Sequence, residues 1–376
     1  MKVISAKKVL IDNDFTPATL VLAGGKIQEI QPYTGEGIDC GDLLVVPGFV
    51  DLHSDTIEKE VEPRSGVFFP IEGAIRELDK KLAIVGITHF FHAISFEEDI
   101  PGKIRNPKTA EQIVRTIKRL NPELLINHYV LLRYEISAPE AYPIVKSLIE
   151  EGYVDLFSIM DHSPGRGQFK TFESWKAFYA QNYNLDDKAL EELKNKKLSG
   201  DKEGCALKLI QLARKHGIKI ASHDDDSPEK IKFNLQQEIT ISEFPLNLPT
   251  AQFAHQHGIT IGMGAPNVVR NKSQSGNVPA RKLIKHGVCD YLCSDYYPGS
   301  LLRAVFSLHQ EMNFSLAQSF QFITSNPARA VTIYHSIAKD SPANLAIINP
   351  QPSNPEVVAT IAKGKFAYLK EGPLAI

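Results

Sequence analysis

Short apolar runs alternate with amphipathic stretches through most of the chain. A continuous apolar run is typical of a β-strand that is buried on both faces, whereas apolar residues three and four positions apart are typical of a helix with one buried face. The runs predicted as strands are 44–52, 86–94, 125–133, 154–160, 218–222, 238–244, 258–263 and 291–294. Helical patterns such as IEGAIRELDKKLAIV and TAEQIVRTIKRL lie between them.

Eight strand-then-helix units predict an α/β fold, a (β/α)8 TIM-like barrel. A long, flat sheet of βαβ units is the competing arrangement. The barrel is favoured because polar residues recur at the C-terminal ends of the strands, where barrel enzymes keep their active sites. Residues 179–203 interrupt the alternation with a charged, helix-favouring stretch, which we expect to be an exposed helical insertion or lid.

The two ends of the chain carry a strand-like pattern without helices between the strands. Residues 1–44 have alternating apolar positions on either side of Gly24-Gly25, a strong hairpin signal, and residues 336–376 contain three more strand-like segments. A few short strands cannot form a core alone. We therefore expect residues 1–44 and 336–376 to build one small β-sandwich domain together, with the barrel formed by residues 45–335.

Composition narrows the class of protein. The chain has 376 residues, 43% of them hydrophobic, and a formal net charge of −2, so it can bury a large core and offers no electrostatic footprint for nucleic acid or a membrane surface. No apolar run is long enough to span a bilayer. The four cysteines form no CxxC pair and are interpreted as core thiols of a cytoplasmic protein. A homodimer is common for barrels of this size, although no decisive interface stripe is present.

The stretch VVPGFVDLHSDTIEKE, residues 45–60, carries the first chemical signal. Its apolar run ends in His53-Ser54-Asp55, and residues two apart on a strand point to the same face. An imidazole and a carboxylate at the end of a buried strand are costly without a partner, and a divalent metal is the usual one. The alternative is a histidine satisfied by a hydrogen bond beside an aspartate that caps a helix.

Similar residues close other predicted strands. The candidate metal ligands are His53, Asp55, Glu135, His162, His223 and Asp295. All six are expected at one rim of the barrel, and residues of these types gathered there are hard to explain as core residues. Two divalent metals fit six ligands better than one, and Glu135 would be the natural bridge. Zinc is the first choice, with manganese and iron as alternatives.

The motifs also resemble a known family. VVPGFVDLHSD after an N-terminal β segment, with the later histidines and aspartate, resembles the amidohydrolase superfamily, although most members carry HxH where this chain has His53-Ser54-Asp55. HSDTIEKEVEPRSGV, SIMDHSPGRGQF, ASHDDD, EFP, MGAPNVVRNKSQSGNV and CSDYYPGSLL resemble the PhnM family, the diphosphatases of the carbon–phosphorus lyase pathway. The resemblance runs nearly end to end. It implies metal ligation by the six residues above, and hydrolysis of α-D-ribose 1-methylphosphonate 5-triphosphate to the 5-phosphate and pyrophosphate.

Such a phosphorylated sugar phosphonate needs a dense anion site. Residues 262–277, GMGAPNVVRNKSQSGN, follow the seventh strand, and their glycines allow backbone N–H groups close to phosphate oxygens. The candidate substrate-binding residues here are Asn267, Arg270, Lys272, Ser273, Ser275, Gly276 and Asn277, and Lys59, Arg64 and Arg166 are candidates from other loops. An ordinary surface loop is the alternative for this segment.

The implied mechanism is hydrolysis by a water that two metals make acidic. Asp295 is the candidate catalytic residue that takes the proton of this water, and a role as a metal ligand is compatible with that. A second hypothesis is a C–N bond hydrolase, a deaminase or deacetylase of the same superfamily. The metal ligands do not separate the two, but the donors in residues 270–277 favour phosphate. A scaffold without catalytic activity is a third hypothesis, which the intact ligand set argues against.

Overall fold

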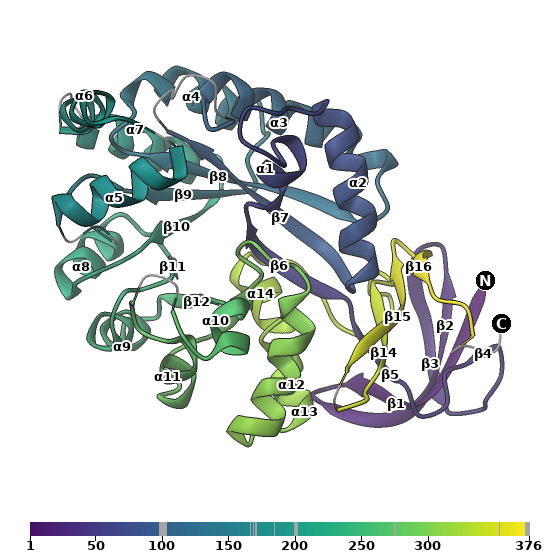
Figure 1. Ribbon diagram of the computed structural model, residues 1–376. Helices are drawn as coiled ribbons and strands as arrows, with labels where there is room; N and C mark the ends of the chain where they lie inside the picture. The colour runs from purple at the N-terminus through teal and green to yellow at the C-terminus, as the bar shows by residue number, and fades with distance from the viewer. Residues whose placement is uncertain are drawn as a thin grey trace.

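A computed structural model describes the chain except residues 98–103, 166, 168, 170, 184, 199–201, 274–275, 353 and 373–376, and except the side chains of residues 182, 183, 202 and 203. Its larger part is a barrel of parallel strands surrounded by helices, and its smaller part is a sheet at the side of the barrel (Figure 1).

Eight parallel strands pair in chain order to form the barrel. They are β6 (Phe49–Ser54), β7 (Ile87–Phe96), β8 (Asn127–Glu135), β9 (Leu156–Met160), β10 (Lys219–His223), β11 (Ile241–Glu243), β12 (Thr260–Gly264) and β13 (Tyr291–Cys293). The last strand meets the first where the Asp295 N–H donates to the His53 carbonyl and the Asp55 N–H donates to the Asp295 carbonyl, both at 2.9 Å. The predicted (β/α)8 barrel is confirmed, and its closure brings two predicted site segments together.

Helices cover the outside of the barrel. They are α1 (Thr56–Val61), α2 (Ile71–Ile84), α3 (Pro107–Leu120), α4 (Tyr142–Glu150), α5 (Phe172–Tyr183), α6 (Asp187–Leu198), α7 (Lys202–Lys215), α8 (Pro228–Gln236), α9 (Leu248–Gln256), α10 (Ala265–Arg270), α11 (Ala280–Lys285), α12 (Ser300–Met312), α13 (Leu316–Gln321) and α14 (Ser325–Ala330). Asn106, Ser227 and Asn247 cap α3, α8 and α9 by accepting a backbone N–H, and each helix has a proline at its first or second position. The apolar faces of most of these helices pack on the strands, whereas α5 and α6 pack mainly on each other.

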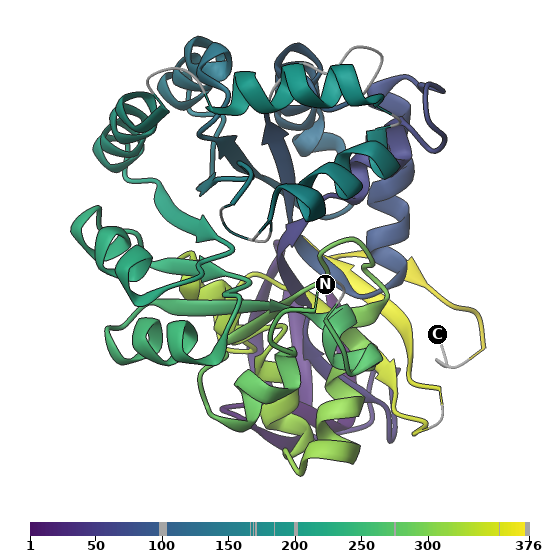
Figure 2. The same ribbon diagram turned by 60° about the vertical axis from the view of Figure 1, so that its left-hand side comes forward.

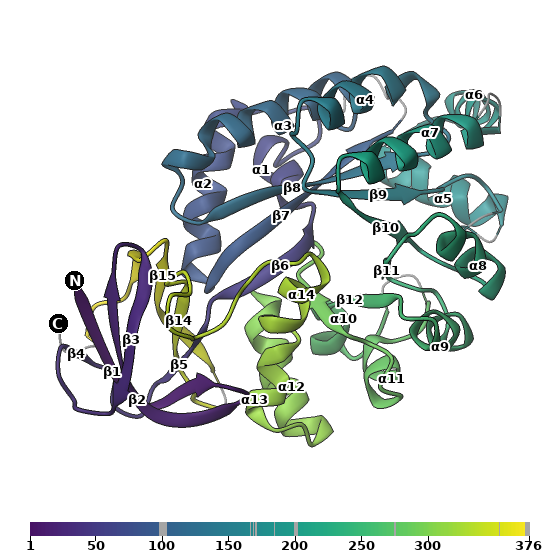
Figure 3. The ribbon, with the colours of Figure 1, turned by 180° about the vertical axis from the view of Figure 1, so that it is seen from behind.

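Both chain ends build the second sheet, as predicted. Its strands are β1 (Lys2–Ile11), β2 (Asp14–Ala23), β3 (Lys26–Pro32), β4 (Ile38–Asp39), β5 (Leu44–Pro47), β14 (Leu345–Asn349), β15 (Glu356–Ala362) and β16 (Lys365–Leu369). The order is β16-β15-β14-β5-β1-β2-β3, with β4 beside β1. The sheet curls over a core that includes Leu20 and Leu345, and the Ile27 N–H donates to the Ser341 carbonyl at 2.9 Å. The N-terminal and C-terminal strands accordingly lie side by side (Figures 2 and 3).

The predicted strand 44–52 is two strands in two different sheets. β5 pairs with β1 and β14, whereas β6 begins the barrel. Gly48 separates them where the backbone passes the Thr88 side chain, since a Cβ at this position would lie 2.2 Å from Thr88 Cγ2. The domain limits at residues 44 and 335 remain a prediction, and the pairing of β5 indicates that the first limit lies a few residues later.

The predicted insertion is helical but only partly exposed. Helices α5 and α6 share a small core, formed by Phe169, Trp175, Tyr179, Leu190 and Leu193. No helix within the described ranges is long and apolar enough to cross a membrane. The four cysteines are free, and three of them, Cys40, Cys289 and Cys293, are buried.

Candidate metal centre and active site

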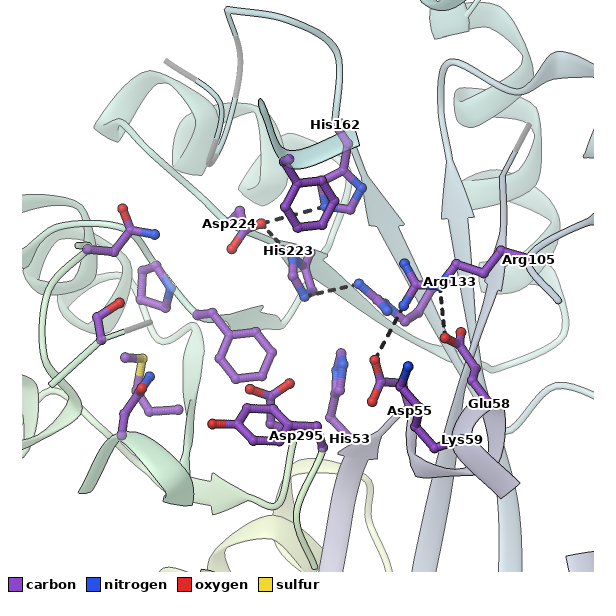
Figure 4. A pocket seen from close by; sticks show the side chains of 18 of the residues that line it. His53, Asp55, Glu58, Lys59, Arg105, Arg133, His162, His223, Asp224 and Asp295 are labelled. Atoms are coloured by element: carbon purple, nitrogen blue, oxygen red, sulfur yellow. Dashed lines mark hydrogen bonds and ion pairs between the residues drawn. The ribbon is translucent and has the colours of Figure 1, made fainter. Parts of the chain in front are cut away.

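A cavity of about 810 Å³ opens at the C-terminal ends of the barrel strands. The predicted residues that line it are His53, Asp55, Lys59, His162, His223, Asn267, Arg270, Ser273, Asn277 and Asp295. Figure 4 shows His162, His223 and Asp224 on one side of this cavity and Asp55, Glu58 and Arg105 on another. We call these the β9–β10 corner and the β6 corner.

The β9–β10 corner has the geometry of a metal site. Asp224 Oδ2 lies 3.0 Å from His223 Nδ1 and 3.7 Å from His162 Nε2, and one ligand atom from each residue lies within 4.8 Å of the others. His223 Nδ1 and Asp224 Oδ2 are buried and have no hydrogen-bond partner among the described residues. Because unpartnered buried polar atoms are costly, and because histidine and carboxylate suit zinc and similar ions, this donor set fits a divalent cation.

The backbone explains how His223 and Asp224 can face the same corner. Neighbouring residues in a strand point to opposite faces, but Asp224 follows the last residue of β10 in the left-handed region, with φ of 55°. Phe244 and Asp295 follow β11 and β13 in the same region, with φ of 54° and 61°. Non-glycine residues in this conformation carry strain and gather at functional sites.

The charges in the β9–β10 corner are strongly coupled. Burial alone would lower the pKa of His162, but the carboxylates of Asp224 and Glu135 raise it to about 9. Burial alone would raise the pKa of Asp224, but His223 and His162 hold it below its usual range. Burial lowers the pKa of His223. The corner therefore holds an ionised carboxylate against imidazoles.

His53 is oriented by a carboxylate that lies deeper in the barrel. Its Nδ1 lies 2.8 Å from Glu243 Oε1, and Ser158 Oγ donates to Glu243 Oε2 at 3.1 Å. A carboxylate on one ring nitrogen fixes the tautomer and leaves the other nitrogen for a metal. The His53 ring lies 5.6 Å from the His223 ring, centroid to centroid.

Glu135 does not line the cavity in this structure. It is fully buried behind His162, with Oε2 at 2.9 Å from His162 Nδ1, and it accepts the Ser137 hydroxyl at 2.8 Å. Burial would raise its pKa, but Lys197 and His162 lower the pKa below its usual range. The contacts are those of a carboxylate that orients His162, and a bridging role for Glu135 stays a prediction.

The β6 corner is organised around Arg105. Its Nη2 lies 3.3 Å from Asp55 Oδ2, its Nε 2.9 Å from Glu58 Oε2, and its Nη1 3.4 Å from Glu97 Oε1. Asp55 is thus paired with a cation rather than exposed for a metal. Asp295 lies nearby, and burial together with the Asp55 charge raises the pKa of Asp295 to about 7.

Among the described residues, four cationic side chains line the cavity: Lys59, Arg105, Arg133 and Arg270. Arg133 lies between the two corners, and its Nη2 is 3.3 Å from His223 Nε2 (Figure 4). Arg133 shares this face of β8 with Glu135, but its described hydrogen bonds are to Ser95 and His223. Arg270 donates to the Tyr296 hydroxyl at 3.3 Å.

Some predicted residues lie elsewhere. Arg64, Lys272 and Gly276 are exposed and are not part of the cavity wall. Arg166 and Ser275 lie outside the described residues.

Sequence reasoning did not assign roles to Asp224, Arg105 and Glu243. The run of three aspartates after His223 is a signal for the first, and the acid in the EFP motif is a signal for the third. Arg105 follows an undescribed segment and has no motif of its own.

Comparisons with known proteins agree with this architecture. The amidohydrolase family model matches residues 177–370. The chain is 31% identical over 345 residues to the α-D-ribose 1-methylphosphonate 5-triphosphate diphosphatase of Escherichia coli K12, and the match covers 88% of this chain and 90% of that protein. The chain therefore belongs to the amidohydrolase family and, within it, to the PhnM family that its motifs resemble.

Solved structures with the same fold are distant in sequence. Dihydropyrimidinase from Brevibacillus agri has a TM-score of 0.64 at 11% identity and covers 98% of this chain and 95% of its own. N-acetylglucosamine-6-phosphate deacetylase from Pasteurella multocida has a TM-score of 0.63 at 13% identity and covers 97% and 99%. At such identities the likeness shows the fold alone.

Proposed function

We propose that this protein uses divalent metal to hydrolyse α-D-ribose 1-methylphosphonate 5-triphosphate to the 5-phosphate and pyrophosphate. The observation that carries the proposal is that one cavity combines a His–His–Asp corner suited to a metal with the four cationic side chains on its walls. The E. coli relative, named for this activity, supports the same substrate.

The cations argue for a polyanionic substrate. Arginine binds phosphate through paired hydrogen bonds, and a triphosphate with a phosphonate carries several negative charges. A neutral amide, the substrate of a C–N hydrolase, would not need Arg133 and Arg270 on the wall of one cavity. The structure therefore favours the phosphoanhydride over the amide.

We propose two divalent metals, zinc first and manganese or iron as alternatives. His162, His223 and Asp224 would hold one, and His53, Asp55 and Asp295 would hold the other, with Glu135 behind His162 as the carboxylate that orients its ring. A divalent metal bound there supplies positive charge that makes a water more acidic and a phosphorus more electrophilic.

The side chains of the cavity have distinct tasks in this reaction. Asp295, a partly buried carboxylate at the cavity wall, accepts the proton of the attacking water. Arg133 and Arg270 stabilise the charge that develops on the phosphoryl oxygens. Asn267, Ser273 and Asn277 add hydrogen-bond donors on the β12 side of the cavity, close to Arg270.

The test is to supply the metal-loaded protein with the ribosyl triphosphate and to follow the products by phosphorus NMR. Pyrophosphate and the 5-phosphate are expected in equal amounts, without free phosphate. ATP tests how strictly the ribosyl phosphonate is required. Turnover of N-acetylglucosamine 6-phosphate or dihydropyrimidines, with no turnover of either triphosphate, would overturn the proposal.

The proposal includes the cellular location and the oligomeric state of the protein. Its four free thiols suit the reducing cytoplasm. A homodimer is proposed from the size of the barrel, and light scattering on the purified protein would measure the assembly.

A further inference from the structure

Lys197 is fully buried although its helix is strongly charged. Helix α6 reads DKALEELKNKKL, and its neighbouring lysines are accessible, with side-chain exposures of 24% for Lys194 and 46% for Lys196. Lysine is rarely buried without a partner, because removing the ammonium group from water is costly. The buried position of Lys197 therefore needs a reason.

The ammonium group begins a chain of hydrogen bonds that ends at the metal corner. Lys197 Nζ donates to Ser137 Oγ at 3.1 Å, and Ser137 Oγ donates to Glu135 Oε1 at 2.8 Å. Glu135 Oε2 lies 2.9 Å from His162 Nδ1. The other nitrogen of that ring, Nε2, lies 3.7 Å from Asp224 Oδ2.

A second contact ties the same insertion to the same histidine. The Trp175 indole on α5 donates to the His162 carbonyl at 3.1 Å. Trp175 is buried in the small core that α5 and α6 share, and Lys197 Nζ lies 5.6 Å from the centroid of the Tyr179 ring in that core. The insertion therefore touches His162 at its backbone and, through Ser137 and Glu135, at its ring.

We propose that Lys197 is a positioning residue: it holds Glu135 in place so that His162 keeps its Nδ1 bonded and presents Nε2 to the cavity. This inference rests on the proposed metal site. Its physical basis is that a buried ion pair gains little net stability, whereas removing one partner leaves the other charge uncompensated. Without Lys197, Glu135 would lose its compensating charge, and the Ser137 hydroxyl that donates to Glu135 would lose the donor that holds it, so the orientation of the His162 ring would be less fixed.

The consequence is that the insertion forms part of the metal site instead of covering it. A barrel strand supplies Glu135, but helix α6 supplies the charge that compensates it. Partners of this kind behind a metal-ligating histidine change metal affinity by about 10- to 100-fold.

The test is Lys197→Met, with Lys196→Met as the matched control one residue earlier on the same helix. Metal affinity is measured by competition with a chelator, on protein whose fold is checked by circular dichroism. We expect Lys197→Met to weaken metal binding by at least about tenfold, and Lys196→Met to stay within about twofold of wild type. Neither measurement needs a substrate, so failure of the proposed hydrolysis would leave this result readable.

The NMR signals of the His162 ring nitrogens are a second measurement, which should not change if Lys197 only stabilises the fold. NMR of ring nitrogens, assigned with His162→Asn, should show the same His162 signals in the metal-free wild type and in Lys196→Met, and changed signals in Lys197→Met. Ser137→Ala removes the connecting hydroxyl while keeping both charges, and should shift both readouts in the same direction by less. Wild-type metal affinity and ring signals in Lys197→Met, or in Ser137→Ala should Lys197→Met not fold, would overturn the proposal.

Discussion

Two corners of one cavity hold acidic clusters, and the two clusters are neutralised in different ways. In the β6 corner, Arg105 pairs with Asp55, Glu58 and Glu97. In the β9–β10 corner, Asp224 faces two imidazoles, and its Oδ2 has no hydrogen-bond partner among the described residues. The carboxylates of the first cluster face a guanidinium, which cannot bind a cation, whereas Asp224 faces imidazoles, which can.

This difference predicts which of the two proposed metals binds more tightly. A carboxylate that already has a guanidinium partner must give it up before it binds an ion, so its metal affinity is reduced by the strength of that pair. The ion-pair partners of Asp224 among the described residues are His223 and His162, whose ring nitrogens can bind the same ion. We therefore expect the β9–β10 corner to bind metal more tightly than the β6 corner, and each prediction below would sharpen or break that order.

The largest loss of metal binding and turnover is expected for Asp224→Asn. Removing the negative charge from the β9–β10 corner should abolish the tighter metal equivalent and lower turnover by at least about 100-fold, since changes around metal ligands commonly cost that much. His223→Ala should lower metal content and activity together, with the fold retained. Metal content by plasma emission, turnover and circular dichroism are the measurements.

Asp226→Asn is the matched control, because Asp226 belongs to the same run of aspartates but is exposed. It should keep wild-type metal content. If Asp224→Asn kept two metals per chain, the β9–β10 corner would not be the tighter site.

Arg105→Met is expected to change metal affinity less than Asp224→Asn does, and in the opposite direction. Freeing Asp55 should tighten the weaker metal equivalent by about tenfold, because a favourable pair that competes with the ion has been removed. Calorimetric titration of metal into the metal-free variant measures this. Arg119→Met, a change at an arginine with 61% side-chain exposure outside the cavity, is the control. A weaker second metal in Arg105→Met would show that Arg105 supports the site instead of competing for it.

A substitution on the cavity wall away from both corners should leave the affinity for metal unchanged. Arg270→Ala removes a cation that lies beside Tyr296, and we expect KM for the triphosphate to rise about tenfold, a loss of about 1.4 kcal/mol of binding. Metal affinity should not change. Lys272→Ala, outside the cavity wall, is the control, and an unchanged KM in Arg270→Ala would remove this residue from the substrate site.

The sequence was sufficient to place most of the barrel and part of the site. Parallel strands buried on both faces are continuous apolar runs, and their C-terminal ends must meet at one rim, so His53, His162, His223 and Asp295 could be brought together without coordinates. The pattern cannot say which sheet an apolar run joins, which is why the segment 44–52 was not divided.

The remaining parts of the site depend on features that a periodic pattern does not contain. Strand alternation points Asp224 away from His223, and only the left-handed backbone at Asp224 brings both to one corner. Lys197 lies in a charged helix that reads as exposed, and its burial depends on how the insertion packs. Arg105 reaches three acids from separate segments, a contact that no local pattern predicts.

At the opposite end of the barrel from the two corners, the buried His335 has a backbone hydrogen-bond partner and needs no metal. His335 Nε2 lies 2.5 Å from the Gly48 carbonyl just before β6, and burial lowers the pKa of His335 to about 4. The unfolded chain, with a histidine pKa near 6.5, binds more protons below that pH, so stability from this group is complete above about pH 6.5 and is lost as the pH falls towards about 4. The loss reaches about 2 kcal/mol at pH 5. His335→Gln keeps a donor for Gly48 and should remove this part of the pH dependence in urea unfolding at pH 5 and 7.5, equally with and without metal. A pH dependence that vanished only when metal was removed would place the acid-sensitive group at the rim instead.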